Sequence, residues 1–226
     1  EGNTKIDLLV NSAYQGLIAM TPHFGKRFWE RPISVYDGHM NVGVRSSYVM
    51  SKLIVPNMIN KKSGLILQIS SYGGFVYLFD VGYGVAHAAM DRLSYDMATE
   101  LKDHNVRAIT MHPGAGQTEI TAFPDGESPT YVGRSVLSLM EQADEEFLDK
   151  TNGKTVFTID LAKKFGFKED YDADGSVNEA RYQGSRQYKQ MMLSTLPQYD
   201  IETALPKYSD TNNEEFADLF KGAKQK

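Results

Sequence analysis

Short apolar runs alternate along this chain with longer segments in which apolar positions recur every three or four residues. Residues 6–10, 65–69 and 106–111 are mostly apolar runs that stop at polar or turn-forming residues, which is typical of buried strands. Residues 35–60 and 83–104 have helical periodicity instead. In the second helical segment the apolar positions are Ala86, Met90, Leu93, Met97 and Leu101. Strands separated by long helices predict an α/β domain with a parallel sheet and helices on both of its faces.

The remaining segments have weaker patterns. Residues 15–33 contain two prolines and two glycines and predict a loop with a short helical turn. Residues 129–143 predict a helix, and residues 155–159 predict a fourth strand. We therefore expect one α/β unit over residues 1–165, followed by a polar, partly ordered extension over residues 166–226.

Composition narrows the classes of function. The 226 residues carry a net charge of −5 without long runs of either sign, so we expect a small-molecule partner and no nucleic acid. Cysteine is absent, which excludes disulfides and thiolate metal sites and fits a cytoplasmic or cytosol-facing protein. The histidines do not have metal-ligand spacing, so we assign no metal. No stretch approaches the roughly 18 apolar residues of a membrane span, and no signal peptide is visible.

Polar residues follow each of the first three predicted strands. They are Asn11 and Ser12, Ser70 and Ser71, and Pro113 and Gly114. In a doubly wound sheet these strand ends meet along one carboxyl edge, where such folds bind ligands. Tyr83 and His87 lie four positions apart on the adjoining helix, which places them on one helical face. This edge is the site that the sequence predicts.

Several spacings in this region belong together. They are Ser71 twelve positions before Tyr83, His87 after it, Pro113 and Gly114 with Thr118, Asn11 with Ala13, and Asn41 with Gly43. As a set they resemble the short-chain dehydrogenase/reductase family. Residues 11–16, 28–30 and 160–166 resemble one branch of that family more narrowly.

The resemblance implies a Rossmann-like, doubly wound sheet and hydride transfer between NAD(P) and a carbonyl/alcohol pair. By the family pattern, Tyr83 is the general acid, acidified by its neighbours. Ser71 holds the carbonyl oxygen, and Asn41 supports a proton-relay water. Hydride addition leaves charge on oxygen, which a pair of hydroxyl groups can stabilise and protonate.

The resemblance also implies a cofactor site. Its residues are Asn11, Ala13, Tyr83, His87, Pro113, Gly114 and Thr118. The cofactor is NADP or NAD. The narrower branch slightly favours NADPH and steroid-like or xenobiotic carbonyl substrates. A homodimer would pair residues 35–60 and 80–104, as family members do.

Position 87 departs from the family pattern, which has lysine there. A neutral histidine acidifies a neighbouring phenol less than a fixed cation does, although it can still bind ribose hydroxyls. We therefore expect weak activity, or activity that falls as pH rises through the pKa of His87. Two alternatives stay open: His87 as a plain surface histidine, and the whole chain as a catalytically degenerate binding or dimerisation module.

The front of the chain is the second departure. No glycine-rich strand-to-helix turn precedes the first strand, and the chain begins with Glu1. We expect that the amino-terminal nucleotide-binding half is absent and that the sequence is a fragment or an incomplete gene prediction rather than a genuine short protein.

Three further features have plainer interpretations. Residues 170–178 resemble part of a calcium loop, but Arg181 stands where a glutamate is required, so we favour a turn over a calcium-responsive adaptor. Trp29 is expected to anchor a loop by packing, with a place in the substrate pocket as the alternative. Residues 214–221 predict a short amphipathic helix that docks on its own domain or a sister subunit.

Overall fold

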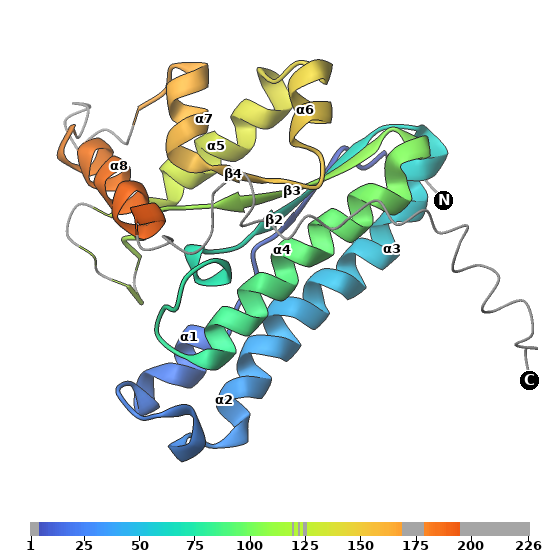
Figure 1. Cartoon of the computed structure of the whole chain (residues 1–226). Helices are drawn as coiled ribbons and strands as arrows, with labels where there is room; N and C mark the ends of the chain where they lie inside the picture. Colours follow the sequence, from blue (N-terminus) through green and yellow to red (C-terminus); the bar gives the residue numbers. More distant parts are fainter. Residues whose placement is uncertain (1–4, 119, 122, 124–125, 169–178, 195–226) are drawn as a thin grey trace, which may run out of the picture.

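The computed structural model describes residues 5–118, 120–121, 123, 126–168 and 179–194. Its sheet has four parallel strands in the order β1-β2-β3-β4. They are β1 (Leu8–Asn11), β2 (Gly64–Ile69), β3 (Val106–His112) and β4 (Thr155–Phe157). Spatial order follows chain order, so each connection is a crossover that carries helix. The predicted Rossmann-like α/β fold is confirmed (Figure 1).

Helices connect the strands and cover both faces of the sheet. The α-helices are α1 (Gly16–Met20), α2 (Ile33–Gly38), α3 (Ser46–Lys61), α4 (Val81–Leu101), α5 (Pro129–Glu141), α6 (Glu145–Thr151), α7 (Thr158–Phe165) and α8 (Glu179–Ser194). A π-helical stretch, η3 (His39–Arg45), joins α2 to α3. The 3-10 turns are η1 (Thr21–His23), η2 (Phe28–Glu30), η4 (Tyr72–Gly74) and η5 (Lys102–His104).

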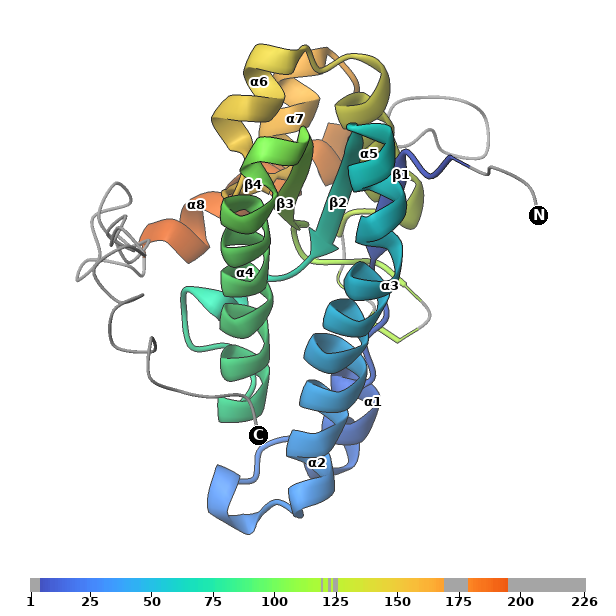
Figure 2. The ribbon, with the colours of Figure 1, turned by 90° about the vertical axis from the view of Figure 1, so that its right-hand side faces the viewer.

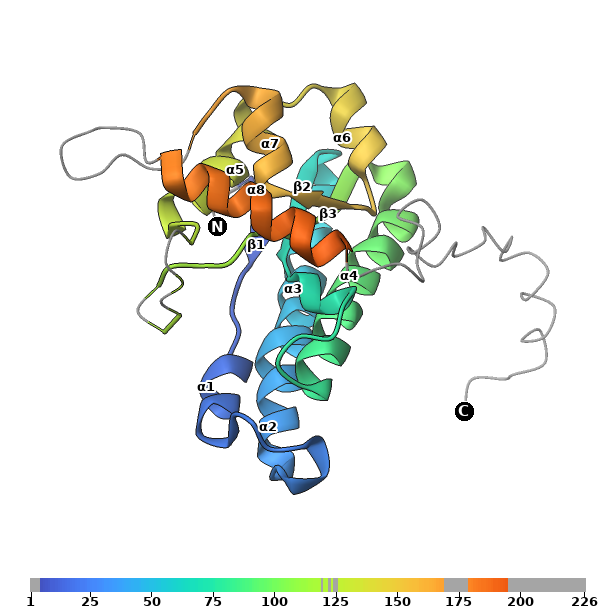
Figure 3. The ribbon, with the colours of Figure 1, turned by 60° about the vertical axis from the view of Figure 1, so that its left-hand side comes forward.

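The helices form two layers. Figures 1 and 2 show α3 and α4 side by side on one face of the sheet, and α5, α6 and α7 on the other. Figure 3 shows α8 lying across the molecule beside α7 and β4. α2, η3 and α3 follow one another without a break, so the predicted helix over residues 35–60 is confirmed with a π-helical irregularity inside it.

Local chemistry sets where the helices begin and end. Asp80, Ser128 and Asp144 are side-chain N-caps of α4, α5 and α6. Lys62 and Asn105 have left-handed backbones, with φ of 56° and 55°, directly after α3 and η5. Such residues close helix ends because they redirect the chain.

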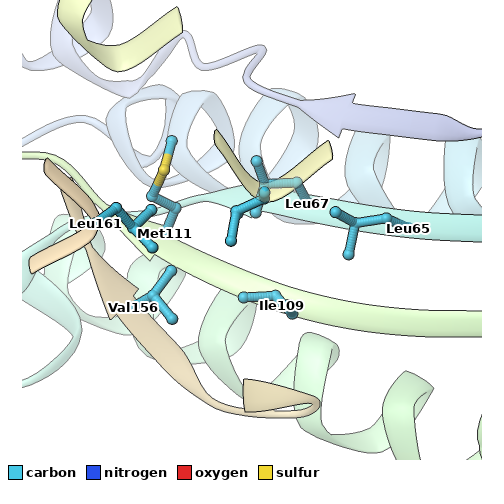
Figure 4. Packing of buried hydrophobic residues seen from close by; sticks show 7 residues of the cluster. Leu65, Leu67, Ile109, Met111, Val156 and Leu161 are labelled. Carbon is cyan, nitrogen blue, oxygen red and sulfur yellow. The ribbon is translucent and has the colours of Figure 1, made fainter. Parts of the chain in front are cut away.

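Each face of the sheet has its own apolar core. On the α5/α7 face, Leu65 and Leu67 of β2 pack with Ile109 and Met111 of β3 (Figure 4). Val156, Leu139 and Leu161 complete this cluster. On the α3/α4 face the cluster consists of Met58, Ile66, Ala98, Leu101, Val106 and Ala108.

Three expectations need correction. The strand predicted over residues 155–159 ends at Phe157, because Thr158 already begins α7. Residues 15–33 contain α1, η1 and η2 rather than one helical turn. The polar region after residue 163 includes a 16-residue helix, α8, whose weak apolar periodicity did not reveal it.

Candidate functional site

The structure brings three strand ends to the carboxyl edge of the sheet, as the sequence predicts. Asn11 ends β1, Ser70 and Ser71 follow β2, and Pro113 and Gly114 follow β3. The parallel pairing of β1, β2 and β3 aligns these ends. The edge also receives η4 and the first turns of α4, which pack against each other.

Asn11 connects this edge to the helical layer. Its buried side-chain amide donates to Ser51 Oγ in α3 at 3.1 Å. The neighbouring strand β2 makes an equivalent bond to α3, because Gln68 Nε2 donates to Ser47 Oγ at 2.7 Å. Both bonds fix the carboxyl half of the strands against α3.

Tyr83 and Ser71 form the central contact of the site. The phenol of Tyr83 donates to Ser71 Oγ at 2.8 Å. Tyr83 lies in the first turn of α4, where its backbone N–H donates to Oδ1 of the N-cap Asp80 at 2.6 Å. A side chain at Gly73 would meet the Tyr83 ring, because a Cβ there would lie 2.4 Å from Cε1. Glycine at this position therefore lets the ring reach Ser71.

The residue before the cap is strained. Phe79 has a φ of 61°, which is uncommon for a bulky side chain, and Asp80 N–H donates to Leu78 O at 2.7 Å across this turn. The Phe79 ring meets the Tyr83 ring edge to face, with centroids 4.9 Å apart. Strained backbone persists where surrounding contacts hold it, and it is common at functional sites.

We expected neighbouring groups to lower the pKa of the Tyr83 phenol, but the described residues do not lower it. Burial raises the pKa of Tyr83 to about 12, the hydrogen bond to Ser71 opposes this rise, and Tyr188 adds to it. The described residues thus hold Tyr83 as a neutral hydrogen-bond donor. An extra positive field is needed to ionise it near neutral pH.

His87 lies at the centre of the site. It is 5% exposed, so the alternative of a surface histidine is wrong. Its ring lies 4.2 Å from that of Tyr83, and its Nδ1 lies 3.3 Å from Ser70 Oγ. Its Nε2 is buried without a hydrogen-bond partner among the described residues. Burial lowers the pKa of His87 to about 3, with smaller effects from His112 and His39. We expected activity to fall as pH rises through the pKa of His87. With this pKa near 3, that fall would lie far below neutral pH.

Four further residues adjoin this centre and were not predicted from the sequence. Tyr14 Oη lies 2.5 Å from His39 Nδ1, and His39 Nε2 lies 3.4 Å from Asp80 Oδ2. Arg31 forms a buried ion pair with the same carboxylate oxygen. The N-cap rule indicates Asp80, because aspartate three positions before Tyr83 precedes a helical pattern. No comparable signal identifies Tyr14, His39 or Arg31, which converge only through tertiary contacts.

Three predicted residues have exposed side chains. Asn41 is exposed and lines a hollow of about 540 Å³ on the outer surface of η3, α3 and α4, together with Tyr48 and Leu93. Its role in supporting a proton-relay water stays a prediction. Ala13 is exposed. Thr118 is exposed and bonds within its own turn, where Thr121 N–H donates to its Oγ1 at 3.0 Å.

Trp29 is not the packing anchor that we expected. It is 70% exposed, and its aromatic contact is with Phe28, whose centroid lies 5.2 Å away. Its alternative place in a substrate pocket stays a prediction.

An apolar hollow of about 240 Å³ opens beside Phe79. Its other lining residues are Leu17, Met20, Thr21, Phe24, Ile120, Thr121 and Phe123. Because the Phe79 ring contacts Tyr83, the hollow adjoins the Tyr83–Ser71 pair.

Several features limit or fall outside the site. Within the described ranges, no three acidic or histidine side chains gather closely enough to share a metal ion. In the same part of the chain, no helix combines the length and the apolar character needed to cross a bilayer. Residues 170–178 and 214–221 lie outside the described residues, so their calcium-loop and terminal-helix interpretations stay predictions.

The chain is similar to several known sequences. Residues 1–126 match the family described as short chain dehydrogenase. Dehydrogenase/reductase SDR family member 1 of Mus musculus is 35% identical over 195 residues, which cover 77% of this chain and 60% of that protein. The Homo sapiens protein of the same name is 34% identical over the same shares. The chain thus spans about three fifths of the length of these relatives.

A solved structure gives the same result for the fold. The 7α-hydroxysteroid dehydrogenase complexed with NADH and 7-oxo glycochenodeoxycholic acid superposes with a TM-score of 0.55 at 22% identity. The superposition covers 68% of this chain and 62% of that one. Since the family match covers more than half of the chain and the strands, crossovers and edge agree with it, the protein belongs to the short-chain dehydrogenase family.

Proposed function

We propose that this chain belongs to an NAD(P)-dependent oxidoreductase that interconverts a carbonyl and an alcohol. The observation that carries the proposal is the 2.8 Å contact between Tyr83 Oη and Ser71 Oγ at the carboxyl edge of the sheet. Two hydroxyl groups at this spacing can both bind one substrate oxygen, which a buried pair in a packing role has no need to do.

The chain's residues account for the proton and the oxygen. Ser71 donates a hydrogen bond to the carbonyl oxygen, and Tyr83 transfers its proton to that oxygen as the adjacent carbon is reduced. A bound dihydronicotinamide supplies the hydride. In the reverse direction Tyr83 takes the proton of the alcohol.

The cofactor assignment rests on groups at the same edge. The unpartnered Nε2 of His87 suits a ribose hydroxyl, and Asn11 holds the strand beside it. Pro113 and Gly114 would frame the nicotinamide. The 7α-hydroxysteroid dehydrogenase was solved with NADH. We propose NADP or NAD, with NADPH favoured by the family branch.

The apolar hollow beside Phe79 supports an apolar carbonyl substrate. Its lining includes Phe24, Phe123 and Ile120. A rigid hydrophobic ketone, steroid-like or xenobiotic, gains from burial against these side chains.

The test is reduction of a panel of apolar ketones, followed by oxidation of NADPH or NADH. Tyr83→Phe keeps the ring and removes the transferable proton, so turnover should fall by roughly 10²- to 10⁴-fold. Tyr48→Phe is the matched control, since Tyr48 is 55% exposed on α3. A Tyr83→Phe variant as active as the unchanged chain would overturn the proposal.

A second candidate is a catalytically degenerate binding or dimerisation module. It is favoured by a neutral His87 and by the raised pKa of Tyr83. The outer surface of α3 and α4 supports a homodimer, because Tyr48, Leu53 and Val85 are exposed there. Sedimentation of the unchanged chain tests the dimer.

The variant His87→Lys separates the two candidates. An ammonium one helical turn from Tyr83 lowers the pKa of the phenol, so an oxidoreductase should turn over at least about tenfold faster at neutral pH. His104→Lys, at an exposed position beyond α4, controls for added charge. No saturable fluorescence change on titration with either dinucleotide, together with no gain from His87→Lys, would favour the binding module.

A further inference from the structure

A buried carboxylate connects the catalytic helix to two other parts of the chain. Oδ1 of Asp80 accepts the backbone N–H of Tyr83 at 2.6 Å. Oδ2 forms the ion pair with Arg31 and lies 3.4 Å from His39 Nε2. Asp80 is 3% exposed and His39 is fully buried. A carboxylate that only caps a helix at the surface needs neither of these additional partners.

The chain of contacts continues from His39 to Tyr14. The phenol oxygen of Tyr14 lies 2.5 Å from His39 Nδ1. The backbone makes room for this contact at Gly16, where a Cβ would lie 2.0 Å from the same nitrogen. Any other residue at position 16 would displace the imidazole, so the local sequence is fitted to this hydrogen bond.

Tyr14 in turn contacts both aromatic rings of the catalytic centre. Its ring meets that of Tyr83 at 6.0 Å, nearly perpendicular, and that of His87 at 4.9 Å. The other groups that face His39 are Asp80, Arg31 and Tyr83. Asp80 therefore reaches Tyr83 twice, once through the backbone cap and once through His39 and Tyr14.

We propose that His39 and Asp80 are positioning residues, which act through Tyr14 to hold the Tyr83 phenol and the His87 ring in the orientation that proton transfer requires. This inference rests on the proposed function of Tyr83. It goes beyond that function because it assigns a role to residues outside the family pattern.

The direction of the hydrogen bond follows from charge. Burial lowers the pKa of His39, Asp80 opposes this, and Arg31 reinforces it. A neutral imidazole carries one N–H, and the carboxylate on the Nε2 side favours the proton there. Nδ1 is then an acceptor, and Tyr14 donates to it. Because burial also raises the pKa of Tyr14, this arrangement holds over the working pH range.

The kinetic test compares three variants of the full chain. His39→Leu removes the acceptor, and kcat should fall by about 10- to 100-fold with little change in KM, since small misplacements of reacting groups have effects of this size. His39→Asn keeps an oxygen near the place of Nδ1 and should restore kcat to within about threefold of the unchanged chain. His104→Leu, at an exposed position, should leave kcat unchanged. A His39→Leu enzyme with full kcat, or equal losses in the Leu and Asn variants, would overturn the positioning role.

A measurement without turnover separates this proposal from the proposed function. Imidazole ¹⁵N resonances of the unchanged chain should show His39 as the neutral Nε2–H tautomer between about pH 6.5 and 8. Tyr14→Phe should shift the Nδ1 resonance of His39, while Tyr48→Phe should not. An Nδ1–H tautomer, or no response to Tyr14→Phe, would overturn the chain of contacts from Asp80 through His39 to Tyr14 whether or not the enzyme turns over. Absence of turnover in the unchanged chain, with the expected resonances present, would overturn the oxidoreductase assignment.

Discussion

The two faces of the same β-strands differ in composition. On the α5/α7 face, β2 presents Leu65, Leu67 and Ile69, and β3 presents Ile109 and Met111. This face stays apolar up to the carboxyl edge. Its charged exception, Arg107, lies at the opposite end of β3, where it pairs with Asp149 of α6 at 2.7 Å.

The α3/α4 face changes character along each strand. On this face β2 presents Ile66 and Gln68, with Ser70 directly after the strand, and β3 presents Ala108, Thr110 and His112. The apolar members lie toward the amino end, and the polar ones lie toward the edge that carries Tyr83. Alternation of side chains thus lets one set of strands supply stability on one face and chemistry on the other. Substitutions on the two faces should have different consequences.

The largest effect on stability should come from the apolar face. Leu67 is fully buried, so Leu67→Ala should lower the free energy of unfolding by about 2–5 kcal/mol through lost burial and a residual cavity. Urea unfolding followed by circular dichroism measures this change.

The matched control is Val10→Ala. Val10 is the register partner of Leu67 in the edge strand β1 and is 36% exposed. Its loss should be clearly smaller, because less apolar surface returns to water. Equal losses at the two positions would contradict a core that is centred on β2 and β3 rather than on the edge strand.

The polar face should make the fold sensitive to acid. The pKa of His87 is about 3 in the folded chain because the ring is buried, against about 6.5 when unfolded. Below about pH 6.5 the unfolded state binds a proton that the folded state excludes, so the free energy of unfolding falls as pH decreases toward 3. The slope from this group reaches about 1.4 kcal/mol per pH unit.

A variant at the same position isolates this contribution. His87→Gln cannot be protonated, so between pH 7 and 5 it should lose about 2 kcal/mol less stability than the unchanged chain. Urea midpoints at the two pH values give the comparison. Parallel losses in both proteins would show that His87 takes up its proton over the same pH range in the folded and the unfolded chain, and a ring kept neutral by burial would be wrong.

The apolar face was easier to predict from the sequence than the site. Mostly apolar runs at 65–69 and 106–111 identified both central strands, because strands that are covered on two faces are rich in apolar residues. The end of β4 was predicted two residues too late. Thr158 and Ile159 are β-branched and common in strands, but packing places them in the first turn of α7.

The site was predictable only where its residues are close in the chain or share a strand end. Ser71, Tyr83 and His87 met as expected because one turn and one helix connect them. Tyr14, His39 and Arg31 come from separate segments and meet only after folding. Burial also reversed the expected direction of the pKa of Tyr83, and no sequence pattern reports how deeply a side chain is buried.

The smallest change in stability should come from the polar residue Gln68, which follows Leu67 in the chain. Gln68 adjoins Leu67 but points to the α3/α4 face, where its Nε2 donates to Ser47 Oγ and its Oε1 is buried without a hydrogen-bond partner among the described residues. Gln68→Met keeps the volume, removes the unpartnered oxygen and loses one hydrogen bond. Ser47 Oγ still donates to Gly43 O at 2.7 Å. Removal of the unpartnered oxygen stabilises the fold and loss of the hydrogen bond destabilises it, so the free energy of unfolding should change by less than about 1 kcal/mol. Gln68→Ala, which opens a cavity, should cost about 2 kcal/mol. If Gln68→Met cost as much as Leu67→Ala, the polar residues of the α3/α4 face would be as important to stability as the apolar core. The proposal that one face supplies stability and the other supplies chemistry would then be wrong.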